Sequence, residues 1–274
     1  MSHLEDRLYD LEARRAQLAE IVLRPRYGDL FAADAGPEFQ VFSQNGEDGI
    51  LLWLLAQTGA AVKTFIEIGV ENALECNTAI LAFVLGWDGL MVEADARGAE
   101  AARRVVERML RGRRNHVEIR QEYVRPETMN RLAGDSPVGV LSIDVDGMDY
   151  WLWKAMEAAA PDIVIIEYNA SMGPQESITV PYRTDFAASE AHPSGYYHGA
   201  SLAALEKLGR AKSYSLVAVD AAGVNAFFVR DAVRPASLPA RRAADIYRPH
   251  RMRCRIHSPE RQWALIRHLP YERV

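Results

Sequence analysis

The chain has 274 residues, of which 49% are hydrophobic and 25% are charged, a composition typical of a globular protein and not of a disordered or fibrous one. The length suits one large α/β domain with an appendage as well as it suits two small domains, and we expect one main domain. Its 32 lysine and arginine residues and 37 aspartate and glutamate residues give a formal charge of −5, which provides no general attraction to nucleic acid or anionic lipid.

The two cysteines, Cys76 and Cys254, are too few for a disulfide framework. No apolar run approaches the ~20 residues of a membrane-spanning helix, and the first residues carry acids without the apolar core of a secretion signal. We therefore expect a cytoplasmic protein whose partners include neither a membrane nor nucleic acid.

The chain opens with an amphipathic pattern that predicts one helix ending near Pro25. Apolar residues recur there at three-, four- and seven-residue steps: Leu4, Leu8, Leu11, Leu18 and Ile21. This stripe packs either on its own domain or against a second copy of the chain, and two or three heptads do not decide between the two. Residues 28–37 resemble a linker, and a second helix is expected to open near Asp48.

From residue 63 the pattern changes to short apolar runs separated by helical stretches, which is typical of a parallel sheet with helices on both faces. We expect strands at residues 64–69, 89–94, 116–121, 138–144, 161–168, 214–219 and 225–230. The last two are joined only by residues 220–224, a connection too short for a parallel crossover, so they form an antiparallel hairpin. The sequence therefore predicts a Rossmann-like α/β fold with a seven-stranded, mostly parallel sheet and a final antiparallel hairpin strand, preceded by the N-terminal amphipathic helix.

Acidic residues gather where the first two predicted strands end. Glu67, Glu71 and Glu75 surround the turn at Gly69, and together they would repel a pyrophosphate but suit a ligand that carries an ammonium and a sulfonium. Glu93 follows at about the distance along the chain at which an acid accepts hydrogen bonds from ribose hydroxyls. The charge pattern therefore favours a cationic cofactor over a phosphate-bearing one.

The next two predicted strands end in Asp144-Val-Asp146 and in Glu167-Tyr-Asn169. Because the carboxyl ends of parallel strands meet at one edge of a sheet, we expect these oxygens to converge. Neighbouring carboxylates repel unless a proton, an arginine or a metal lies between them, and hard divalent cations prefer oxygen ligands. The alternative is that Asp144 and Asp149 cap the next helix while Asn169 closes a turn, but capping does not account for all four groups.

A long insertion between the fifth and sixth predicted strands is rich in Tyr, His and Gly, which is typical of a substrate-facing loop. The substrate-binding residues that we expect in it are Tyr182, Arg183, His192, Tyr197 and His198. His198 is the candidate general base, because a neutral imidazole accepts a proton near pH 7, with a helix-capping or hydrogen-bonded structural histidine as the alternative.

Taken together, a series of short motifs resembles an FkbM-related group of S-adenosylmethionine (SAM)-dependent methyltransferases over about residues 40–230. The motifs are Ser43-Gln-Asn-Gly-Glu-Asp48, Phe65-Ile-Glu-Ile-Gly-Val70, Asn77-Thr78, Leu141-Ser-Ile-Asp-Val-Asp-Gly147, Ile166-Glu-Tyr-Asn169, Gly199-Ala-Ser-Leu202 and Asn225-Ala-Phe-Phe-Val229. The resemblance implies a class I, Rossmann-like SAM site lined by Glu67, Gly69 and Glu93. The other cofactor-binding residues that we expect are Gln44, Asn77, Thr78 and Glu122.

The acids that end the fourth and fifth strands also resemble the metal site of catechol and macrolide-sugar O-methyltransferases, which hold magnesium with Asp, Asp and Asn or a further Asp. The resemblance thus implies a magnesium or manganese site at Asp144, Asp146, Glu167 and Asn169. The chain departs from the pattern at two places: the glycine-rich SAM loop is reduced to Gly69, and Glu167 stands where those enzymes have aspartate.

We therefore expect a SAM-dependent, divalent-metal-dependent O-methyltransferase that acts on a small polar metabolite such as a sugar or a natural-product hydroxyl, with Asp144 and His198 as catalytic residues. The alternatives are a glycosyltransferase, because Asp144-Val-Asp146 also satisfies the D-x-D pattern, an N-methyltransferase on the same scaffold, and a non-catalytic assembly protein. The expected segments are the N-terminal helix and linker (1–36), which could form a homodimer seam, the methyltransferase domain (37–240) and an arginine-rich extension (241–274). The extension reads as a solvated or acid-paired surface segment, with binding of an anionic acceptor as the alternative.

Overall fold

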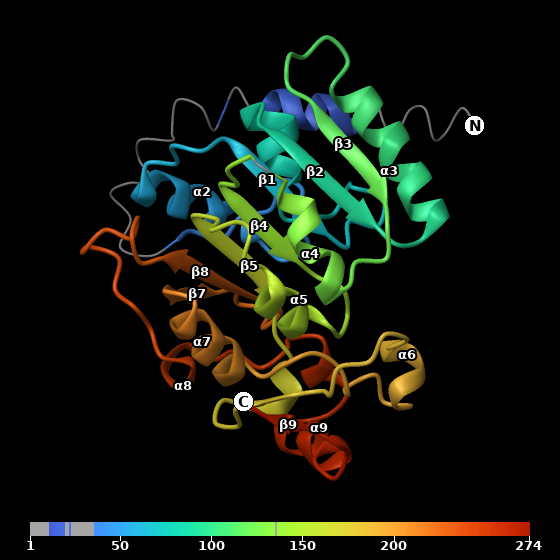
Figure 1. The fold of residues 1–274 in the computed structure, drawn as a ribbon, viewed down its shortest axis with the longest axis vertical. Helices are drawn as coiled ribbons and strands as arrows, with labels where there is room; N and C mark the ends of the chain where they lie inside the picture. Colours follow the sequence, from blue (N-terminus) through green and yellow to red (C-terminus); the bar gives the residue numbers. More distant parts are fainter. Residues whose placement is uncertain (1–10, 20–21, 23–35, 135) are drawn as a thin grey trace. The chain divides into compact units, whose positions relative to one another are not determined.

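The computed structural model describes residues 11–19, 22, 36–134 and 136–274 (Figure 1). The chain divides into two compact units, Met1–Val124 with Pro137–Ser142, and Arg125–Ser136 with Ile143–Val274. Its main sheet has seven strands in the order β3-β2-β1-β4-β5-β8-β7. Within the described ranges no helix is long and apolar enough to cross a bilayer.

The first unit carries three parallel strands, with β1 paired to β2 and β2 paired to β3. Its elements are α2 (Glu47–Thr58), β1 (Thr64–Ile68), the π-helical segment η2 (Leu81–Leu85), β2 (Asp88–Glu93), α3 (Ala96–Met109) and β3 (Val117–Gln121). Residues 47–56 of α2 are all buried, as expected for a helix that is apolar on nearly every side. Strand β2 carries Gly89 because a Cβ there would lie 2.3 Å from the ring of Phe65 on β1.

The second unit carries the antiparallel part of the sheet, in which β8 pairs with both β5 and β7. Strand β4 (Val140–Ile143) begins in the first unit and ends in the second. The other elements up to the hairpin are α4 (Pro126–Ala133), α5 (Asp149–Ala155), β5 (Ile163–Glu167), the 3-10 turn η3 (Ala170–Met172), β6 (Ile178–Thr179), α6 (Ala188–Ala191), α7 (Leu202–Ala211), β7 (Tyr214–Val219) and β8 (Asn225–Arg230).

The C-terminal extension folds as part of the second unit. It contains α8 (Ala243–Ile246), the 3-10 turn η4 (Arg253–Arg255), α9 (Pro259–Ile266) and β9 (Glu272–Arg273). Strand β9 pairs antiparallel with β6, and Tyr197 of the insertion donates its phenol hydrogen to the carbonyl of Pro270. The extension therefore holds the insertion in place, which the interpretation as a solvated surface segment did not foresee.

The predicted α/β fold is confirmed, and each of the seven predicted strands is present with ends that move by at most two residues. The β7–β8 hairpin is antiparallel, as its short connection required. Of the predicted N-terminal helix, residues 11–19 and 22 are helical, while Leu4, Leu8 and Ile21 lie outside the described residues. Leu11 and Leu18 are 60% and 63% exposed.

Candidate functional site

The turn after β1 is shaped by three residues with left-handed backbone, of which only one is glycine. Gly69, Glu71 and Ala73 have φ values of +87°, +48° and +61°. A non-glycine residue in this region stores strain on the order of 1 kcal/mol and persists only where its surroundings enforce it. The glycine-poor loop predicted from the sequence thus keeps a tight, defined backbone.

Glu67 at the end of β1 is 1% exposed and binds the segment that follows the loop. Its Oε1 accepts from the backbone N–H of Asn77 (2.8 Å), and its Oε2 accepts from the N–H and the hydroxyl of Thr78 (2.9 and 2.5 Å). Burial raises the pKa of this carboxyl above its usual range. The structure therefore brings these three predicted cofactor residues together, with both Glu67 oxygens engaged in closing the loop.

Glu93 ties the end of β2 to the same loop. Its carboxylate accepts from the backbone N–H groups of Glu71 (2.7 Å) and Asp95 (2.8 Å), and the N–H of Glu122 donates to its carbonyl (3.0 Å). Glu93 therefore connects the turn after β1 with the end of β3 in the first unit, and the assignment of Glu93 and Glu122 to a cofactor stays a prediction. Gln44 is exposed in the segment before α2.

Asp48 fixes the segment that leads into α2. Its Oδ2 accepts from the backbone N–H groups of Val41, Phe42 and Ser43 at 2.7–3.0 Å, and the hydroxyl of Ser43 accepts from the N–H of Asp48 (3.0 Å). Burial raises the pKa of Asp48 to about 6. The hydroxyl of Ser43 thus satisfies one free backbone N–H in the first turn of α2.

The second unit holds an acid cluster formed by Asp144, Asp146 and Glu167. One carboxylate oxygen of each lies within 4.8 Å of the others, with Glu167 buried, Asp144 half-buried and Asp146 exposed. Burial and the negative charges of Asp144, Asp149 and Asp146 raise the pKa of Glu167 well above its usual range. A divalent cation would relieve this repulsion, and three carboxylates are a donor set that magnesium and manganese accept.

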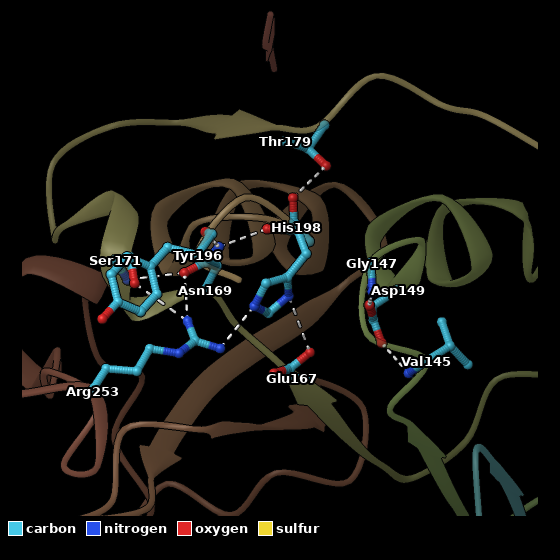
Figure 2. A network of polar contacts seen from close by, with 11 residues as sticks. Val145, Gly147, Asp149, Glu167, Asn169, Ser171, Thr179, Tyr196, His198 and Arg253 are labelled. Atoms are coloured by element: carbon cyan, nitrogen blue, oxygen red, sulfur yellow. Dashed lines mark hydrogen bonds and ion pairs between the residues drawn. The ribbon is translucent and has the colours of Figure 1, made fainter. Parts of the chain in front are cut away.

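Asp149 shapes the loop that presents two of these acids (Figure 2). Its two carboxylate oxygens accept from the backbone N–H groups of Val145 and Gly147, each at 2.9 Å. Asp146, which lies between Val145 and Gly147 in the sequence, has a left-handed φ of +52°. Gly147 packs against Phe186, whose ring atom would lie 2.4 Å from a Cβ at this position. The exposed carboxylate of Asp146 is therefore held by a strained and tightly bonded loop, which is a feature of functional sites.

Asn169 is engaged by its own surroundings. Its amide N–H groups donate to the carbonyls of Tyr196 and His198, each at 2.7 Å, and its Oδ1 accepts from the N–H of Ser171 (2.9 Å) and from Arg253 (3.1 Å). The structure thus groups the three carboxylates as candidate metal ligands. Asn169, the expected fourth ligand, instead binds the backbone of the insertion.

His198 is buried and hydrogen-bonded instead of standing free as a base. Its Nε2 lies 2.7 Å from Arg253 Nη2, and its Nδ1 lies 3.7 Å from Glu167 Oε2 (Figure 2). Burial and the positive charge of Arg253 lower the pKa of His198 to about 3. The arrangement matches the alternative of a hydrogen-bonded structural histidine, and a role in taking the substrate proton is not favoured.

The other predicted substrate residues make local contacts. Arg183 is exposed and pairs with Asp185 (3.2 Å), and His192 Nδ1 lies 2.8 Å from the hydroxyl of Ser194. Tyr182 packs against Trp151, with ring centroids 6.2 Å apart, while Tyr197 contacts the C-terminal extension. Their assignment to substrate stays a prediction.

Arg253 is the site residue that sequence reasoning missed. It belongs to the extension, yet its guanidinium contacts Asn169, Ser171 (3.3 Å) and His198 and lies 5.8 Å from the ring centroid of Tyr196. The signal in the sequence was general: an acid pair that needs a cation, and a tail rich in arginine. Nothing in the spacing singled out this arginine among its neighbours.

No family model matches the chain, and no curated protein matches it. Solved structures similar to it include an O-methyltransferase from Bacillus cereus in complex with SAH (18% identity, covering 64% of this chain and 76% of that one, TM-score 0.38). An O-methyltransferase family protein from Burkholderia thailandensis has 12% identity, 80% and 71% coverage and a TM-score of 0.44. Magnesium protoporphyrin IX methyltransferase from Synechocystis with bound SAH has 11% identity, 67% and 81% coverage and a TM-score of 0.45. The functional argument therefore rests on the residues of the site itself.

Proposed function

We propose that this chain is a SAM-dependent methyltransferase that uses magnesium or manganese and methylates a hydroxyl group of a small polar metabolite. The observation that carries the proposal is the acid cluster: three carboxylates within 4.8 Å of one another, one of them buried, where β4 and β5 end in the second unit. The positive charge of Arg253 offsets the repulsion among these carboxylates only in part, because the pKa of Glu167 stays well above its usual range. The ends of parallel strands are also where α/β folds bind ligands.

The proposed cofactor site lies in the first unit. Glu93 ends β2, the position at which an acid accepts from ribose hydroxyls, and it is fixed there by two backbone N–H groups. Glu71 and Glu75 add negative charge next to Gly69, which suits the sulfonium and ammonium of SAM and disfavours a phosphate. Gln44, Asn77, Thr78 and Glu122 remain proposed members of this site.

In the second unit, Asp144, Asp146 and Glu167 would hold the cation, which lowers the pKa of a bound hydroxyl and orients it. Asp149 keeps the loop of Asp146 in position through its two backbone hydrogen bonds. Since the bare nitrogen of His198 already accepts from Arg253, an exposed carboxylate of the cluster is the better proton acceptor. The methyl acceptor then needs only alignment, which can supply much of the rate.

The test is SAM binding by titration calorimetry, with and without Mn²⁺, in the wild type and in two variants. Glu93→Gln should weaken SAM, because one anionic acceptor is lost. Asp146→Asn should leave SAM binding intact without metal but weaken Mn²⁺, with Asp185→Asn, an exposed acid of the same unit, as the control. If the wild type bound no SAM but bound a uridine or guanosine diphosphate with Mn²⁺, the chain would be a glycosyltransferase and the proposal would fail.

We also propose that the chain forms a homodimer through its N-terminal helix. The support is the exposed apolar stripe of Leu11 and Leu18, seven residues apart on that helix.

A further inference from the structure

Arg253 makes hydrogen bonds to three different side chains. Its Nη1 donates to Asn169 Oδ1 (3.1 Å) and Ser171 Oγ (3.3 Å), while its Nη2 faces His198 Nε2 at 2.7 Å. A guanidinium donates hydrogen bonds but accepts none. His198 Nε2 must therefore be the acceptor and carries no hydrogen.

This contact fixes the state of the imidazole. A neutral imidazole carries one hydrogen, and when Nε2 has none, that hydrogen is on Nδ1. His198 is 2% exposed, so water does not compete for either nitrogen. Its Nδ1 has no hydrogen-bond partner and lies 3.7 Å from Glu167 Oε2. The N–H of His198 thus faces the buried member of the acid cluster (Figure 2).

The geometry points to Arg253 as a positioning residue: it holds His198 with its Nδ1–H directed at Glu167 across 3.7 Å, so that a small shift of the carboxylate makes the hydrogen bond that orients Glu167 for the cation. This inference rests on the proposed function for its cation. Groups that orient a metal ligand from behind typically change metal affinity by 10- to 100-fold when they are removed. Because Arg253 comes from the C-terminal extension, the extension contributes to a site whose carboxylates all lie elsewhere in the chain.

The first measurement is the tautomer of His198 in the metal-free protein, read from long-range ¹H–¹⁵N correlations of its imidazole. The His198→Gln variant identifies the signals, because they disappear from its spectrum. We expect hydrogen on Nδ1 in the wild type. Arg253→Lys keeps the charge but not the planar fork, so it should lose this preference. Arg255→Lys, an exposed arginine of the same turn, should keep it.

The second measurement is Mn²⁺ affinity by electron paramagnetic resonance. Arg253→Lys and His198→Leu should each weaken Mn²⁺ about 10-fold or more, and the two changes together should weaken it no further. His198→Gln should retain most of the affinity, because its amide can accept from Arg253 and donate to Glu167. Arg255→Lys should bind as the wild type does.

An Nε2–H tautomer in the wild type would overturn the inference, and so would an unchanged tautomer in Arg253→Lys. A changed tautomer with unchanged Mn²⁺ affinity in both Arg253→Lys and His198→Leu would overturn the part that concerns Glu167. If the wild type bound no Mn²⁺, the proposed function would lose its cation, while the tautomer, measured without metal, would still decide what Arg253 does to His198.

Discussion

Asp48 shows that a buried carboxylate of this chain can serve the fold alone. Three backbone N–H groups bind its Oδ2, yet its Oδ1 is buried without a hydrogen-bond partner. Burial outweighs those bonds and raises the pKa from 3.8 to about 6. Between about pH 4 and pH 6 the folded state therefore holds a proton on Asp48 that the unfolded chain has released.

This difference predicts how stability depends on pH. A raised pKa in the folded state gives stability that is present below about pH 4 and is lost as the pH rises to about 6, by on the order of 3 kcal/mol. The amide that replaces the carboxyl in the Asp48→Asn variant cannot titrate. The free energy of unfolding of this variant, relative to that of the wild type, should therefore rise between about pH 4 and pH 6. Urea unfolding at several pH values measures the difference, with Glu107→Gln as an exposed control. A difference that stays constant between pH 4 and 6 would contradict the prediction.

At the level of elements, the strands were predictable because nearly continuous β-branched runs such as that of β5 leave little choice of structure, and because turns mark their ends. The pairing of β6 with β9 was not, because each has two residues and the two lie far apart in sequence. The site divides in the same way. Asp144, Asp146 and Glu167 could be placed from the ends of their own strands. The acceptors of the Asn169 amide N–H groups and the partner of the His198 ring come from distant segments without a local signal.

The N-terminal helix exposes large apolar side chains on one face. Ala16 is buried and Arg15 lies over the ring of Phe42, while Leu11 and Leu18 stay exposed. If this stripe is the seam of the proposed homodimer, changing Leu11 and Leu18 to Gln should shift the mass in solution from dimer to monomer in sedimentation experiments. Gln17→Ala on the same helix is the control. A wild type that sediments as a monomer would remove the proposal.

At the scale of the whole molecule, we expect a change in the second unit to lower the local stability of that unit alone. Gln262 in α9 is 1% exposed, accepts from the hydroxyl of Ser171 (2.8 Å) and donates to the carbonyl of His257 (2.7 Å). Gln262→Leu leaves buried polar groups without partners, at a cost of about 1–3 kcal/mol. Hydrogen exchange should then speed up around η3 and β6 but not in β1 and β2, which belong to the first unit.

Arg261→Gln, on the exposed side of the same helix, should leave the exchange rates of η3 and β6 unchanged. Equal acceleration of β1 and β2 in Gln262→Leu would show that the units do not open separately.

Because Arg253 lies late in the sequence, it is synthesised after the other residues of the site. A ribosome delivers Asp144, Asp146, Glu167 and His198 well before it reaches the guanidinium that holds the histidine. A polypeptide released early, for example by a premature stop codon shortly before residue 253, would keep the three neighbouring negative charges but leave the imidazole free to place its hydrogen on either nitrogen. Such a fragment would also lose β9 and its pairing with β6, so it would disturb the insertion as well as the orientation of His198.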